Sequence, residues 1–259
     1  MIITSTIHFT HPPQKIISLV PSQTELLSYL ALQQQVIGIT KFCVHPQQWF
    51  TTKTRVGGTK NINLDLIKKL SPDLIIANKE ENVKEQVEML AKEFDVWVTD
   101  VNTLDEALEM INDIGQLTRT VNKAAELVAA IQKSFAQLQI EHFPIPAVYL
   151  IWKDPYMTVG GNTFINDMMK RGGFQNIYHG KDRYPEITLN ELRASPCKWI
   201  LLSSEPYPFA QKHVDELWEQ LPGKKIILVD GEMFSWFGSW LLNVPLYFKK
   251  LREEIVQVP

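Results

Sequence analysis

The sequence predicts an α/β fold of two similar lobes with parallel central sheets, joined by one long helix. A repeated strand–helix pattern, a helical stretch between the two copies and the bulk composition predict it. Each copy opens with an apolar strand, at residues 15–20 and 147–152, followed by a turn and a helix. Alternating buried strands and helices are typical of a parallel sheet covered by helices.

The repeat continues through two further pairings along each half. A short helix, a Ser-Pro pair and an apolar strand occur at residues 63–77 and again at residues 188–202. A helix and a strand then follow at residues 87–98 and at residues 214–229. Two such Rossmann-like lobes imply a cleft between them, and clefts are where small ligands most often bind.

Helical spacing dominates the region between the copies. A capping box at residues 103–106 opens one helix, and a second stretch runs from Thr120 to about Ile140. About 20 helical residues would form a rod of roughly 30 Å that resists wide hinge bending. We therefore predict an N-terminal lobe at 1–103, a helical region with the linker at 104–144 and a C-terminal lobe at 145–259.

Composition and missing motifs exclude several classes of protein. A net charge of −3 argues against a nucleic-acid binder that relies on bulk positive charge. The two cysteines, Cys43 and Cys197, fall in different halves, so we expect two free thiols. The chain has no nucleophile elbow, phosphate loop or zinc-protease motif, so an enzyme is disfavoured. The first residues lack signal-peptide features, so we expect either an export signal upstream or a protein that stays inside the cell.

Five short stretches occur in a characteristic order and spacing. They lie at residues 17–26, 56–58, 70–77, 172–176 and 230–234. Together they resemble the substrate-binding proteins of ABC importers for vitamin B12, iron-siderophores and haem, over nearly the whole chain. The resemblance implies the helical-backbone periplasmic-binding-protein fold, a shallow cleft and a metal-chelate ligand. No intrinsic cofactor is expected; the ligand implied is a cobalt corrinoid or a ferric chelate.

Candidate ligand-binding residues lie where strands end, the usual ligand edge of an open α/β sheet. They are Ser22, Gln23, His45, Thr59, Lys60, Asn78 and Lys79 in the first lobe, and Trp152, Tyr156, Arg183, Tyr184, Trp236 and Phe237 in the second. Aromatic side chains suit a flat corrin or porphyrin face, and Trp236 and Tyr184 are the first choices. The cations Lys60, Lys79 and Arg183 suit carboxylates, phosphate or an anionic siderophore.

His45 leaves three roles open: axial ligation of cobalt or iron, a hydrogen bond in the cleft, or a plain loop role. With Cys43 it offers too few ligands for a structural zinc site. Similar proteins often carry Tyr-Pro where this chain has His45-Pro46. The vitamin B12-binding members carry Trp at the positions of Thr59 and Asn78. The sequence therefore does not choose among cobalamin, cobinamide, siderophore and haem.

The resemblance also implies acidic residues that dock onto arginines of a membrane permease. Glu81 or Glu85 is the candidate in the first lobe and Glu205 in the second. Such charges set partner choice and encounter rate more than tightness. We thus expect a monomer that captures a metal chelate and delivers it to an ABC permease, in the periplasm or cell envelope. The alternatives are an intracellular corrinoid or tetrapyrrole carrier or sensor and, less favoured, a two-lobed α/β enzyme.

Overall fold

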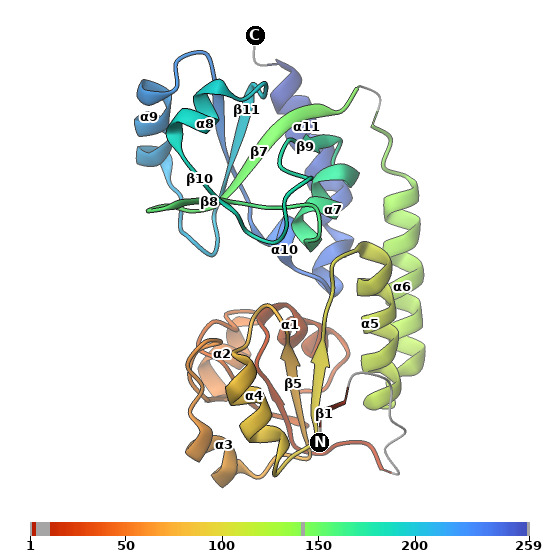
Figure 1. The fold of residues 1–259 in the computed structure, drawn as a ribbon. Helices are drawn as coiled ribbons and strands as arrows, with labels where there is room; N and C mark the ends of the chain where they lie inside the picture. Colours follow the sequence, from red (N-terminus) through yellow and green to blue (C-terminus); the bar gives the residue numbers. More distant parts are fainter. Residues whose placement is uncertain (1, 4–10, 141–142, 258–259) are drawn as a thin grey trace. The chain divides into compact units, whose positions relative to one another are not determined.

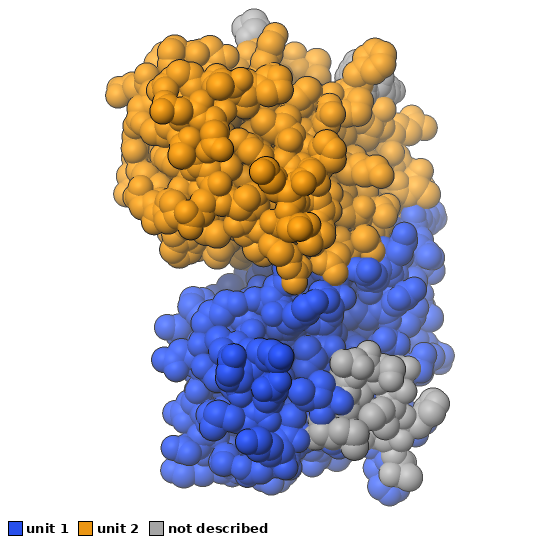
Figure 2. Space-filling model, in the orientation of Figure 1, with its two compact units in different colours: residues 1–101, 105–133, 236–240 blue, residues 102–104, 134–235, 241–259 orange. Residues whose placement is uncertain are grey.

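The computed structural model describes residues 2–3, 11–140 and 143–257, and the chain divides into two compact units. Unit 1 comprises residues 1–101, 105–133 and 236–240, and unit 2 comprises residues 102–104, 134–235 and 241–259 (Figure 2). The helices expected to link the lobes therefore fall mainly in unit 1. A five-residue segment from the second half of the sequence, residues 236–240, also belongs to unit 1.

Unit 1 is built on a six-stranded sheet in the order β1-β6-β5-β2-β3-β4, in which every described pairing is parallel, as predicted. Its strands are β1 (Ile2–Ile3), β2 (Ile16–Ser18), β3 (Val36–Ile39), β4 (Thr54–Arg55), β5 (Leu74–Asn78) and β6 (Val96–Thr99). Ile17 of β2 lies between Ile75 of β5 and Gly38 of β3. All residues of β2 and β5 are buried, as expected for central strands covered on both faces.

Helices follow the strands of unit 1. They are α1 (Pro21–Tyr29), α2 (Gln47–Thr52), α3 (Leu64–Leu70), α4 (Lys84–Ala91), α5 (Leu104–Leu117) and α6 (Val121–Ala136). Local sequence explains their starts: α1 begins at a proline, and the Asn63 side chain caps α3 by accepting from the backbone N–H of Leu66.

The helical pair α5 and α6 is tightly packed. The two helices lie side by side (Figure 1). Gly115 of α5 allows this contact, because a Cβ there would lie 2.5 Å from the Cβ of Ala124 on α6. The 16 residues of α6 span about 24 Å, which is shorter than the predicted rod. The helix ends at Ala136, and the N–H of Leu138 closes its last turn on the carbonyl of Phe135.

Unit 2 contains a second sheet in the order β10-β8-β7-β11-β12, with β9 also paired to β7. Its strands are β7 (Ile145–Trp152), β8 (Tyr156–Thr158), β9 (Phe174–Asn176), β10 (Glu186–Ile187), β11 (Trp199–Ser203) and β12 (Lys225–Val229). The parallel prediction is right for β7, β9, β11 and β12. It is wrong for β8 and β10, because a tight turn at 153–155 returns the chain antiparallel to β7.

The helices of unit 2 repeat the plan of unit 1. They are α7 (Phe164–Arg171), α8 (Leu189–Ala194), α9 (Gln211–Gln220), α10 (Glu232–Ser235) and α11 (Val244–Gln257). The short 3₁₀ helix η1 (Ser239–Leu242) begins in unit 1 and ends in unit 2. Thr188 and Glu191 form a reciprocal capping box at the start of α8. Within the described ranges, no helix is long and apolar enough to cross a membrane.

The predicted repeat is present in the structure. Its matching pairs are β2–α1 with β7–α7, α3–β5 with α8–β11, and α4–β6 with α9–β12. The two copies differ after the first strand, where unit 2 inserts β8 before α7. The carboxyl ends of the parallel strands in each unit therefore carry the loops in which the candidate residues lie.

Candidate functional site

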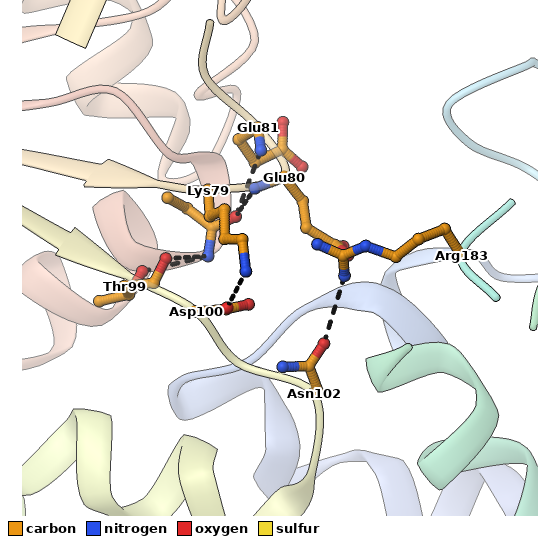
Figure 3. Close-up of polar contacts among 8 residues, drawn as sticks. Lys79, Glu80, Glu81, Thr99, Asp100, Asn102 and Arg183 are labelled. Carbon is orange, nitrogen blue, oxygen red and sulfur yellow. Dashed lines mark hydrogen bonds and ion pairs between the residues drawn. The ribbon is translucent and has the colours of Figure 1, made fainter. Parts of the chain in front are cut away.

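A buried polar network organises the carboxyl edge of the unit 1 sheet. Asn78 ends β5, and its Oδ1 accepts hydrogen bonds from the backbone N–H groups of Glu80 (2.8 Å) and Glu81 (3.2 Å) (Figure 3). Its Nδ2 donates to the carbonyl of Thr99 at 3.2 Å, and Nε2 of Gln23 donates to Oγ1 of Thr99 at 2.7 Å. The side chains of Gln23 and Asn78 thus hold the ends of β5 and β6 to α1.

Asn82 joins three loops of the same edge. Its Oδ1 accepts from the backbone N–H of Asn78 (2.9 Å), and its Nδ2 donates to the carbonyls of Thr59 (3.2 Å) and Leu19 (3.3 Å). Asn82 is 6% exposed, so these bonds are shielded from water. Sequence reasoning missed this residue, since an asparagine after a strand reads equally well as part of a turn.

Four of the predicted ligand-binding residues are buried in this region. Ser22, Gln23, Thr59 and Asn78 are each at most 7% exposed. The Oε1 atom of Gln23 is buried and has no hydrogen-bond partner among the described residues. The geometry gives Gln23 and Asn78 a role in shaping the loops.

The two lysines predicted near this edge bind neighbouring groups of unit 1. Lys60 donates from its ammonium group to the backbone carbonyl of Glu80. Lys79 forms an ion pair with Asp100 at 2.5 Å (Figure 3). Both partners of that pair are exposed, so it contributes at most about 1 kcal/mol. Both lysines therefore keep their charge close to the strand ends.

His45 lies in an aromatic cluster of unit 1. Its ring stacks on Trp240 with centroids 5.1 Å apart and meets Trp236 edge-on at 5.6 Å. The two indoles also contact each other at 5.6 Å. The cluster joins the loop before α2 to the segment 236–240.

The segment 236–240 is fastened to α1 as well. Ser239 donates to a carboxylate oxygen of Glu25. Burial raises the pKa of Glu25, while the bond from Ser239 and the nearby His45 oppose that rise. Gly238 has a φ of 145°, and a Cβ there would lie 3.2 Å from the Cβ of Leu26. Glycine thus permits the backbone of this segment to press against α1.

Trp236 and Phe237, both predicted to face a ligand, are 5% and 7% exposed. Trp236 joins the cluster with His45 and Trp240. Trp49, on the nearby helix α2, is also buried. The structure therefore brings together His45 and Trp236 from the predicted set.

Unit 2 carries a second aromatic cluster at the end of β7. Trp152 is 41% exposed, and its ring meets that of Tyr207 edge-on at 5.6 Å. Tyr207 packs on Phe209 (4.7 Å) and on His213 (5.4 Å). Tyr156, on the neighbouring strand β8, is half-buried. Trp152 is the aromatic candidate that offers the most open surface.

The surroundings of His213 in this cluster favour its neutral form. Its Nδ1 accepts from the backbone N–H of Ala210 at 2.9 Å, and its Nε2 lies 3.3 Å from the hydroxyl of Tyr207. Burial lowers the pKa of His213, and the positive charges of Lys212 and Lys153 lower it further. Sequence reasoning did not single out this histidine, because it lies within a helix away from any strand end.

Arg183 and Tyr184 lie in the loop before β10. Arg183 has a φ of 53°, and its backbone N–H donates to Oδ1 of Asn162 at 2.6 Å. Its carbonyl accepts from Gly160, and its Nη1 lies 3.5 Å from Oδ1 of Asn102 (Figure 3). Tyr184 is half-buried. The loop is thus fixed on both sides while the guanidinium lies partly exposed.

The three candidate docking carboxylates differ in their surroundings. Glu81 is half-buried beside Asn78, and Glu85 is exposed in the first turn of α4. Glu205 accepts from Oγ of Ser235 at 2.5 Å, and Gly231 leaves room for it, since a Cβ at Gly231 would lie 2.6 Å from its Cγ. The Glu205 carboxylate is therefore held in one orientation by unit 2.

Metal and thiol chemistry find little support in the described part of the chain. No group of three or more His, Cys, Asp or Glu side chains is placed to hold a metal ion there. Cys43 and Cys197 are free and buried, as predicted. Burial raises the pKa of the Cys43 thiol, which accepts a hydrogen bond from Thr24 at 3.1 Å. Two α/β units with aromatic and polar loops at their strand ends define a binding protein.

Comparison with known proteins identifies the family. A family model described as periplasmic binding protein matches residues 16–223. The vitamin B12-binding protein of Pectobacterium carotovorum is 24% identical over 237 residues, which cover 89% of this chain and 85% of that protein. The Bacillus subtilis protein YvrC, named an uncharacterized ABC transporter substrate-binding lipoprotein, is 27% identical over 68% of this chain. That match spans only 57% of YvrC itself.

Solved structures share the fold. The periplasmic vitamin B12 binding protein of Vibrio cholerae superposes with a TM-score of 0.77 at 20% identity, over 93% of this chain and 99% of that one. The periplasmic heme-binding protein from Roseiflexus in apo form gives a TM-score of 0.77 at 18% identity, over 92% and 98%. The predicted fold class is thereby confirmed.

The chain belongs to the periplasmic binding protein family, since the family model covers well over half of its length. This membership confirms the predicted class, a substrate-binding protein of a transport system. It also confirms that the chain is a binder and not an enzyme.

Proposed function

We propose that this chain captures a metal chelate outside the cytoplasm and delivers it to an ABC permease, and that the chelate is a cobalt corrinoid or, second, a ferric siderophore. The similarity to vitamin B12-binding proteins over 89% of the chain carries the proposal. Relatives named for an ABC transporter lipoprotein and for vitamin B12 support the route and the ligand class.

Aromatic side chains supply the contacts to the flat ring of the chelate. Trp152, at the end of β7, has an indole that is partly open to solvent. Tyr156 on β8 and Tyr184 in the loop before β10 are half-buried in the same unit. In unit 1 the ring contact comes from the cluster of His45 and Trp236. Aromatic rings bury a large flat ligand with little loss of side-chain entropy.

Polar side chains have two roles in this proposal: one orients the ligand, and others contact the permease. Arg183, on its fixed loop, pairs with a carboxylate or phosphate of the chelate. Glu85 in unit 1 and Glu205 in unit 2 face the permease. Because Ser235 fixes the Glu205 carboxylate, that charge is presented without the entropy cost of ordering a free side chain.

A ligand titration tests the proposal. Purified protein is titrated with cyanocobalamin, cobinamide, haemin and a ferric siderophore, and tryptophan quenching is read beside the visible spectrum. We expect saturable binding of one corrinoid, weakened in Trp152→Ala and Trp236→Ala. Trp218→Ala is the matched control, because this 68% exposed indole on α9 lies outside the predicted ligand loops.

The outcomes separate the ligand class from the fold. Saturation by the siderophore alone would move the assignment from corrinoid to ferric chelate. No response to any of the four compounds would refute the metal-chelate proposal and leave only the family. Equal loss in Trp218→Ala and Trp152→Ala would show that the signal comes from general quenching and not from a binding site.

A further inference from the structure

The sheet of unit 2 ends at β12, and its outer edge carries no further strand among the described residues. The inner edge of β12 pairs with β11 along its whole length, from Lys225 opposite Trp199 to Val229 opposite Ser203. The backbone groups on the outer edge are therefore left without a ladder partner, which makes this edge a template for another strand.

β12 differs from the other sheet ends of the described chain. β1, β4 and β10 have two residues each, and β4 and β10 carry a charged residue, Arg55 and Glu186. β12 has five residues, and the four that follow Lys225 are all aliphatic. Short length and charge are the usual protection of an edge strand, and β12 has neither in its central part.

Apolar side chains extend the surface beside this edge. A hollow of about 400 Å³ beside β12 is lined by the apolar residues Trp199, Val214, Trp218, Ile226 and Ile227, and by the charged residues Asp215, Lys224, Lys225 and Glu254. Trp218 is 68% exposed, Leu228 is 36% exposed, and Ile226 and Ile227 are half-buried. Partly exposed apolar side chains beside an unpaired strand edge favour contact with another strand.

The charges at the two ends of the strand are complementary to those of an antiparallel second copy of the same strand. The amino end is positive, with Lys224 and Lys225, and the ammonium of Lys224 is fixed by the carbonyls of Ser195 (2.6 Å) and Cys197 (2.8 Å). The carboxyl end is followed by the acidic Asp230. An antiparallel copy of the same strand places each positive end beside a negative one, whereas a parallel copy would set lysine against lysine.

We propose that β12 is a self-association surface, on which a second copy of this chain adds its own β12 in antiparallel fashion about a two-fold axis at Ile227. In this register Ile227 faces its own counterpart and Ile226 faces Leu228 of the second copy. Lys224 then lies opposite Asp230 of the second copy. The two sheets become one continuous sheet, and Trp218 is covered at its rim. This goes beyond the proposed transport function and departs from the expected monomer.

The interface is small, because only five residues of each strand pair. It falls at the low end of specific interfaces, so we expect a reversible dimer with a dissociation constant on the order of 10–100 µM. Such a dimer would form only where the protein is concentrated, for example where many copies occupy a confined compartment.

Sedimentation velocity from about 5 µM to about 500 µM, which brackets the expected constant, tests the proposal. The wild-type chain should shift from monomer to dimer, and outward-facing amides of β12 should exchange more slowly at high concentration. Ile227→Lys sets two like charges on the axis and should abolish the shift. Leu228→Lys, at a more exposed position, repeats the test if the first variant folds poorly.

Val121→Lys is the matched control, since this valine on α6 of unit 1 is 51% exposed and lies outside the edge. It should dimerise like the wild type. A wild-type chain that stays monomeric at the highest concentration overturns the proposal. A dimer that persists in both lysine variants of β12, or leaves the exchange of the β12 amides unchanged, overturns it too, because the contact would then use another face.

Discussion

Replacing Asn82 by alanine should loosen the whole carboxyl edge of the unit 1 sheet. The substitution removes the acceptor for the N–H of Asn78 and the donor for the carbonyls of Leu19 and Thr59. These groups lie in a region where the side chains are at most 7% exposed, so water cannot easily replace the lost partner. The three loops would then have to move apart or keep unpaired polar groups.

The bond lengths set the size of the effect. The N–H of Asn78, bound at 2.9 Å, would become a buried donor without a partner, at a cost of about 1–3 kcal/mol. The two longer bonds, at 3.2 and 3.3 Å, contribute about 0.5–1 kcal/mol each. We expect Asn82→Ala to lower the free energy of unfolding by about 3 kcal/mol, or the melting temperature by about 6–12 °C.

Urea unfolding followed by tryptophan fluorescence and circular dichroism measures this loss as a lower midpoint at unchanged slope. Asn190→Ala is the matched control, because Asn190 is exposed on α8 and its side chain accepts a hydrogen bond from the guanidinium of Arg193. That variant should change the free energy by less than about 0.5 kcal/mol. A loss in Asn82→Ala no larger than in Asn190→Ala would refute the claim that Asn82 holds the loops.

Asn82→Asp separates donation from acceptance. The introduced carboxyl can still accept from the N–H of Asn78, but its second oxygen faces the carbonyls of Leu19 and Thr59. Burial and these carbonyls raise its pKa above the usual range, so the unfolded chain releases the proton first as the pH rises. The defect should therefore grow from acid to neutral pH. A defect independent of pH would contradict this geometry.

Three further substitutions test other parts of the structure. Burial lowers the pKa of His213, so the unfolded chain binds the proton first as the pH falls below about 6.5. The free energy of unfolding should therefore decrease below that pH, and it should decrease less in His213→Asn. Urea midpoints at several pH values measure this difference. Gly238→Ala adds a Cβ 3.2 Å from the Cβ of Leu26 at a residue with positive φ, and should lower the free energy of unfolding by about 1–3 kcal/mol, measured by thermal unfolding. An unchanged stability would show that the backbone of this segment can move away from α1. Ser235→Ala removes the bond to Glu205 and should cost about 1–2 kcal/mol in urea; a neutral variant would mean that Glu205 is held by other groups.

The repeat could be predicted because it depends on local patterns. Buried strands such as β5 are continuous apolar runs, and helices such as α8 start at a capping box that is visible in the sequence. The strands β8 and β10 were missed because strands of three and two residues are too short to show a periodic pattern in the sequence. Their antiparallel pairing follows from the turn at 153–155, which reverses the direction of the chain but leaves no recognisable pattern in the amino-acid sequence of the strands.

The candidate site was harder to predict, because polar residues after a strand serve two purposes. Gln23 and Asn78 stand where a ligand contact is expected, yet their amides bind Thr99 and the backbone of the next loop. A sequence shows that such a residue is near the edge but not which way its side chain turns. Asn82, which joins three loops, gave the same weak signal as any turn asparagine.

The segment 236–240 could not be assigned from sequence position, because its partners in unit 1 lie about 200 residues away along the chain. Chain order placed Trp236 in the second lobe, whereas its described ring contacts are with His45 and Trp240. The one local hint is Gly238, which lies beyond the end of α10 and directly after Trp236 and Phe237, and which allows a close approach of the backbone.

The return of residues 236–240 to unit 1 affects the order in which the protein can be made. A nascent chain that has emerged as far as α6 contains every strand of the unit 1 sheet. It still lacks Ser239, which binds Glu25, and the indoles of Trp236 and Trp240, which contact His45. Unit 1 is therefore completed only after nearly all of unit 2 has been synthesised. Until then, the surface of α1 that later meets Gly238 stays open to chaperones and to other chains.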